Sequence, residues 1–102
     1  MKGRLVELLG EVLILHGWGQ SAPLWPSEVI VVRSALRILA VLMARHESAP
    51  QLIGKSVQPV MAMVNLMKDA SRFTAEMEVD RAEVAINGLK VLRLLTSEKE
   101  SA

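Results

Sequence analysis

The chain has 102 residues, of which 51% are hydrophobic, 23% charged and only 3% aromatic. Its 12 basic and 11 acidic residues leave a net charge of +1, too weak for electrostatics to favour nucleic acid or an anionic membrane as partner. It has no cysteine, which excludes disulfides and thiolate metal sites.

Charged residues interrupt both of the most apolar segments. Glu7 and Glu11 break the N-terminal segment, which therefore does not fit a signal peptide. Arg33 and Arg37 lie in the middle of the second, whereas a membrane span needs about 20 apolar residues with few charges. We therefore predict a soluble intracellular protein, cytoplasmic or nuclear.

The first predicted helix covers residues 4–16, where leucines and valine recur at helical spacing. Gly17 and Gly19 follow it as a stop signal. The second helix covers residues 27–46, with Ser27 as a candidate N-cap. Its main apolar line is formed by Val32, Leu36, Leu39 and Met43.

In the second half of the chain, the sequence predicts a short helix over residues 50–56, a long one over 57–70 and a last one over 80–97. Pro59 cannot donate a backbone hydrogen bond, so the short helix should end or bend there. Asp80 and Glu83 have capping-box spacing at the start of the last helix. The loop-like stretch SRFTAEMEV precedes it, and since no strand alternation occurs, the predicted class is all-α.

The second and last helices resemble each other. When residues 31–49 are set over residues 84–102, Val31 meets Val84 and Leu36 meets Leu89. In the same alignment Leu39 meets Leu92, Arg37 meets Lys90, and the endings Glu-Ser-Ala coincide. Because internal repeats define a fold, this alignment predicts two copies of one helical unit, with Leu39 and Leu92 both fully buried.

The order of a short helix, a long helix, a loop and a longer helix with an A-L-x-x-L-x-x-L core resembles armadillo and HEAT repeats. The resemblance covers about one and a half units: residues 4–46 as a partial repeat and 50–97 as a full one. It implies a right-handed helical-repeat segment of four long helices and a short one, forming a single domain over residues 1–102. Such a segment is expected to belong to a larger protein or an oligomer.

The resemblance also implies a binding surface, because the third helix of each armadillo unit lines a concave groove. That role falls to residues 27–46 and 80–97, which places Arg37 and Lys90 along one wall, beside Ser34 and Asn87. The positions at which the family carries a main-chain-binding asparagine hold Val41 and Leu94. The asparagine ladder is therefore not expected here.

The chemical motifs do not predict an enzyme. His16-Gly17-Trp18-Gly19 resembles an oxyanion-hole turn, but the chain lacks a nucleophile elbow, and Gly54-Lys55-Ser56 lacks the first glycine of a P-loop. The two histidines have no neighbouring ligand at metal-binding spacing. We expect no catalytic residue, cofactor or metal.

Several residues remain as candidates for binding a partner. The basic residues form either a solvated helix face or a stripe that binds an acidic segment, and nucleic acid is a less favoured partner for such a stripe. The tryptophans are either lids over helix ends or interface anchors. The methionines Met43, Met61, Met63 and Met67 are either core filler or a docking surface. The candidate set is Arg33, Arg37, Asn87, Lys90, Arg93, Trp18 and Trp25.

The prediction for function is a non-catalytic protein-interaction or scaffold module. Its partner is predicted to be a protein, as an acidic or amphipathic segment, a second copy in a homodimer, or adjacent repeats. The alternative is a small helical bundle that acts as a homo-oligomerisation domain through its Met and Leu faces.

Overall fold

A computed structural model describes residues 2–19, 22–45, 53 and 57–101, and these residues form helices, turns and short connections without a strand. The helices are α1 (Lys2–Gly17), α2 (Pro26–Arg45), α4 (Val57–Lys68) and α5 (Glu78–Ser101), with two short 3₁₀ helices, η1 (Ala70–Arg72) and η2 (Ala75–Met77), between α4 and α5. The all-α prediction is thus confirmed for the described residues. Apart from residue 53, the predicted short helix over 50–56 lies outside them.

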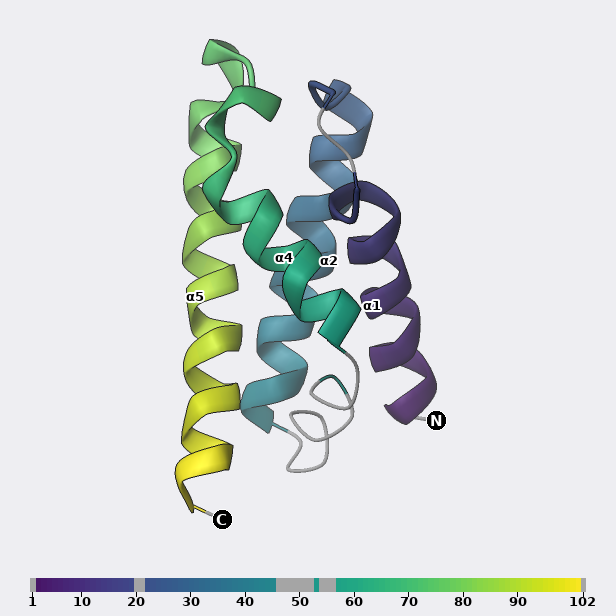
Figure 1. The fold of residues 1–102 in the computed structure, drawn as a ribbon, viewed down its shortest axis with the longest axis vertical. Coiled ribbons are helices and arrows are strands. Elements are labelled where there is room, and N and C mark those ends of the chain that lie inside the picture. The colour runs from purple at the N-terminus through teal and green to yellow at the C-terminus, as the bar shows by residue number, and fades with distance from the viewer. Residues whose placement is uncertain (1, 20–21, 46–52, 54–56, 102) are drawn as a thin grey trace.

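The four α-helices form two antiparallel hairpins packed side by side (Figure 1). The hairpins are α1 with α2 and α4 with α5. Between the hairpins, α1 packs against α4 and α2 against α5, and each of these pairs runs in the same direction. The molecule is therefore built from one parallel layer of α1 and α4 and another of α2 and α5.

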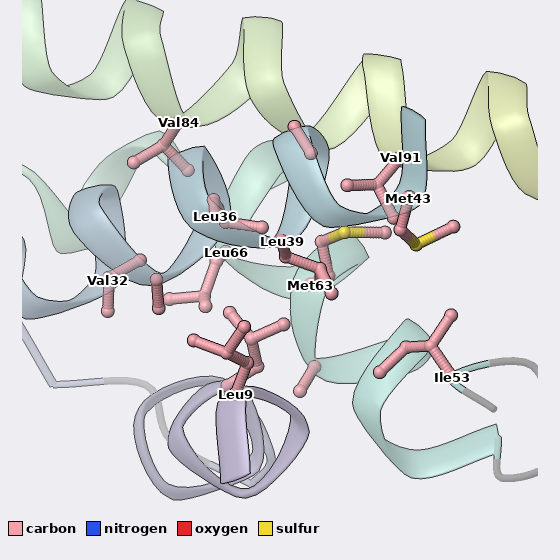
Figure 2. Close-up of a cluster of buried hydrophobic side chains, with 14 of the residues drawn as sticks. Leu9, Val32, Leu36, Leu39, Met43, Ile53, Met63, Leu66, Val84 and Val91 are labelled. Carbon is pink, nitrogen blue, oxygen red and sulfur yellow. The ribbon is translucent and has the colours of Figure 1, made fainter. Parts of the chain in front are cut away.

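The core lies between these layers and receives side chains from all four α-helices (Figure 2). Leu36 and Leu39 of α2 are fully buried, as are Leu66 of α4 and Val84 and Val91 of α5. Met43 and Met63 are buried in the same cluster and Met67 packs against it, while Met61 is 43% exposed. Most of the methionine cluster therefore fills the core.

The start of α2 differs from the prediction. The helix begins at Pro26, and Trp25, not Ser27, is the residue before it. Proline suits this first position because its missing N–H would have no partner there. The Glu28 carboxylate accepts a hydrogen bond of 2.9 Å from the Trp25 backbone N–H, which is the back-bond of a capping box.

Glycine shapes the end of α1 in two ways. Gly19 has φ +70°, a backbone conformation that favours glycine, and it follows the end of the helix as the stop signal predicts. Gly17, by contrast, is the last helical residue and is buried against α4. A Cβ at this position would lie 2.4 Å from the Ala62 carbonyl oxygen, so Gly17 is needed for close helix contact.

The buried faces of α2 and α5 do not follow the predicted alignment. It matches buried Leu36 with Leu89, which is 59% exposed, and exposed Ile38 with fully buried Val91. It also makes Leu92 fully buried, whereas Leu92 is only partly buried. A shift of one residue brings Val32 onto Val84, Leu36 onto Gly88 and Leu39 onto Val91, all buried.

Candidate partner-binding groove

Two arginines of α2 meet two carboxylates of α5 along the parallel contact between these helices. Arg33 Nη1 lies 2.6 Å from Asp80 Oδ1, and Arg37 Nη2 lies 2.5 Å from Glu83 Oε1. Arg33 Nε is also 3.2 Å from Glu83 Oε2, close enough for an ion pair but not aligned as a hydrogen bond. The four residues therefore form one charge network that joins α2 to α5.

This network corrects two expectations. Asp80 and Glu83 do not start the last helix as a capping box, because α5 begins at Glu78 and both carboxylates turn toward α2. Arg33 does not stand in an open basic stripe, because two carboxylates already neutralise it. Its role in the structure is to join two helices.

Beside the network, α2 and α5 enclose an open groove of about 640 Å³. Its apolar lining comes from short or branched side chains, and the candidate residues Arg37, Asn87 and Lys90 line it as well. The groove-lining apolar residues are Ala40, Val41, Ala44, Val79, Ala82 and Ile86. Arg37 and Lys90, which were expected along one wall, both line this groove, Arg37 from α2 and Lys90 from α5.

The described residues satisfy the polar groups in the groove only partly. Asn87 is 7% exposed, yet its side chain makes no hydrogen bond to another described residue. Lys90 is exposed and has no carboxylate at ion-pair distance within the described part of the chain. Arg37 retains 57% exposure of its side chain beside Glu83. An occupant could therefore gain a hydrogen bond at Asn87 and an ion pair at Lys90.

The remaining candidate residues lie elsewhere. Arg93 is outside the groove, in a neighbouring hollow that it shares with Lys90, Leu89 and Thr96. Trp18 and Trp25 belong to the connection between α1 and α2 and are 41% and 73% exposed. The high exposure of Trp25 does not fit a lid packed over a helix end. The groove itself thus contains three of the seven candidates, Arg37, Asn87 and Lys90.

A second polar cluster, which the sequence analysis missed, lies where the two interhelical connections meet. Arg72 of η1 is only 3% exposed. Its Nε donates to the Ala22 carbonyl at 2.9 Å and its Nη1 to the His16 carbonyl at 2.5 Å, so it supplies a donor to the last turn of α1. The Leu24 backbone N–H donates back to the Arg72 carbonyl at 2.8 Å.

His16 and Glu28 complete this cluster. His16 Nδ1 lies 3.0 Å from Glu28 Oε2, and this pair links the end of α1 to the start of α2. The hydrogen bond from the Trp25 backbone N–H lowers the pKa of Glu28, with further lowering by the hydrogen bond and charge of His16 and by the charge of Arg72. The histidine of the apparent oxyanion motif therefore belongs to a helix junction.

Little in the sequence could have revealed Arg72. It lies in the stretch expected to be most loop-like, where an arginine is ordinarily exposed. Its partners are backbone carbonyls, which every residue type has, so the sequence does not indicate which residues they belong to. For the same reason the sequence did not predict the role of Asn65, whose side chain donates to the Gly17 carbonyl at 3.3 Å.

No helix in the described part of the chain has the length and apolar character to cross a membrane. Among those same residues, no three His, Cys, Asp or Glu side chains cluster as metal ligands. No protein-family model, curated protein or solved structure matches the chain.

Proposed function

We propose that this chain is a non-catalytic protein-interaction segment built from stacked helical hairpins of the armadillo or HEAT type. The groove between α2 and α5 would bind an acidic or amphipathic segment of a partner protein. Its place of action would be the cytoplasm or nucleus, in keeping with a chain that has no cysteine.

The observation that carries the proposal is the chemistry of the groove. Its apolar lining offers contact area, whereas Asn87 and Lys90 offer a hydrogen bond and a positive charge that the described residues leave unused. An exposed ion pair contributes only about 0–1 kcal/mol. Apolar contact must therefore supply most of the affinity, with Lys90 and Arg37 selecting for carboxylates.

The arrangement of the helices supports the stacked-repeat interpretation over a simple bundle. In an up-and-down four-helix bundle, neighbouring helices alternate in direction. Here α2 and α5 are parallel neighbours, and so are α1 and α4. Equivalent helices of successive repeats are related in this way, because each unit packs in the same orientation on the one before it.

The methionines favour this proposal over self-association through a methionine-rich surface. Met43 and Met63 are 3% and 1% exposed, so their side chains are already used in the core. A surface built from Met61 alone would be small.

A peptide-display selection on the immobilised full chain tests the proposal. We expect selected peptides to combine apolar residues with Asp or Glu. Lys90→Glu should weaken their binding by about fivefold or more at low salt, because it replaces an attractive pair with a repulsive one. This effect should shrink as salt rises.

Arg93→Glu is the matched control, since it makes the same charge change on α5 outside the groove. Since Arg93 is next to Lys90 but does not line the groove, the Arg93→Glu variant should weaken peptide binding clearly less than Lys90→Glu does. Arg37→Glu is less informative, because it would also place two carboxylates together at Glu83. Selected peptides without acidic residues, or equal effects of the Lys90 and Arg93 variants, would contradict the proposal.

A further inference from the structure

The outer side of α1 carries an apolar seam that nothing in the described chain covers. Leu5, Leu8 and Leu15 are 41%, 47% and 67% exposed, with half-buried Val12 between them. Their alternating spacing of three and four residues is the pattern of a helix-packing seam. Val31 and Ile38 of α2 are 44% and 45% exposed. We call these five exposed residues, without Val12, the α1 edge.

The α1 edge faces away from the second hairpin. Leu8 is nine residues, or about 2.5 helical turns, from Gly17, which contacts α4. Val31 is separated by the same interval from Ala40, which lines the groove with α5. Both apolar residues therefore point away from α4 and α5. Contiguous exposed apolar side chains of this kind mark surfaces that pack against another protein.

A corresponding surface lies at the other end of the stack. Leu89 of α5 is 59% exposed and lies nine residues from Asp80, which pairs with Arg33 of α2. Leu92 of α5 and Val60 and Val64 of α4 are half-buried. We call these four residues the α5 edge. Figure 1 places α1 and α5 along opposite sides of the molecule.

We propose that the α1 edge of one copy of this chain packs against the α5 edge of a second copy. Inside the chain, the first hairpin already packs on the second through parallel contacts of α1 with α4 and α2 with α5. A second copy stacked in the same direction continues this contact, with its α1 beside α4 and its α2 beside α5. In the register of the existing contacts, where Gly10 lies beside Pro59 and Arg37 beside Glu83, Leu8 and Leu15 then come beside Val60 and Val64. Ile38 comes within about one helical turn of Leu89.

The proposed contact joins two different surfaces, so it does not close on itself and produces an open series of oligomers. It rests on the stacked-hairpin architecture of the proposed function, but it does not use the groove between α2 and α5. Peptide binding and self-association are therefore separate measurements. Failure to bind acidic peptides would leave the self-association proposal standing, and a monomeric chain would leave peptide binding in the groove standing.

Sedimentation of the full chain over a wide concentration range tests the inference. The wild type should pass from monomer through dimer to longer species as concentration rises. Leu8→Glu removes the α1 edge and Leu89→Glu removes the α5 edge, so each variant alone should stay monomeric. An equal mixture of the two retains one complementary pair of edges, and it should form a one-to-one dimer that grows no further.

Ile30→Glu is the control, because Ile30 is an exposed apolar residue of α2 outside both edges. It should associate as the wild type does. Circular dichroism verifies that each variant is folded, and Leu15→Glu, at a more exposed position of the same seam, replaces Leu8→Glu if the latter is not. A monomeric wild type at every concentration overturns the inference. Association that Leu8→Glu abolishes but Leu89→Glu preserves also overturns it, because this result indicates a dimer through the α1 edge alone. In that case the Leu8→Glu variant stays monomeric when it is mixed with Leu89→Glu.

Discussion

At the residue scale, single residues set the contact between the two hairpins. Gly17 lets the end of α1 approach the backbone of α4, and the Asn65 side chain donates to the Gly17 carbonyl at the same place. The position needs glycine because a β-carbon would collide with backbone, which cannot move aside as a side chain can.

We expect Gly17→Ala to destabilise the protein by about 1–3 kcal/mol, the usual cost of overpacking a close contact. The better helix propensity of alanine offsets at most about 1 kcal/mol of this cost. Thermal or urea unfolding followed by circular dichroism measures the change.

Gly10→Ala is the matched control on the same helix. Its β-carbon would meet side-chain atoms of Ile53 and Pro59 at 3.3 to 3.5 Å, which is at most slightly tight. It should change stability by no more than about 1 kcal/mol. Equal losses from both substitutions would mean that the close approach at Gly17 is not the cause.

At the element scale, the helices appear where the sequence indicates, but their rotation does not follow the repeat alignment. Apolar spacing locates residues 4–16 and 27–46 as helices, and α1 and α2 lie within two residues of these bounds. A leucine at a position of these helices does not by itself mean that the position faces the core. On α5, Leu89 is exposed, whereas Val84, Asn87 and Gly88 are buried.

The rotation of α5 predicts that leucine-to-alanine substitutions in α2 and in α5 lower the stability by different amounts. Leu39→Ala removes a fully buried side chain and should cost about 2–5 kcal/mol. Leu89→Ala removes one that is 59% exposed and should change stability by about 0.5 kcal/mol or less. Paired unfolding curves in urea provide the comparison, and similar losses at both sites would show that the burial pattern of α5 is wrong.

At the scale of the whole molecule, Arg72 ties the two hairpins together at one end. It lies in the connection of the second hairpin and donates to carbonyls in the first hairpin's connection and at the end of α1. An arginine can serve two acceptors at once because its guanidinium holds several donors in a fixed plane.

Arg72→Met should lower stability by about 2–3 kcal/mol, because methionine keeps much of the apolar stem but leaves buried carbonyls without a donor. Arg72→Lys should recover only part of the loss, since its ammonium group lacks the planar spread of donors. Differential scanning calorimetry measures both variants. Full stability of Arg72→Met would contradict a linking role.

The sequence by itself determined the helical class, the approximate position of each described α-helix and much of the methionine core. These properties follow from local spacing, since apolar residues at helical intervals must share a face. It also brought Arg37, Asn87 and Lys90 into one candidate group, and they line one groove.

Only the tertiary structure decided which carboxylates neutralise Arg33 and Arg37, and which carbonyls hold Arg72. Asp80 and Glu83 fit a local capping box as well as a contact with α2, and only the parallel packing of α2 and α5 selects the second. The same packing sets the rotation of α5, so that Val91 is buried and Leu89 exposed. Such choices depend on residues far apart in the chain, and the spacing within one helix carries no information about them.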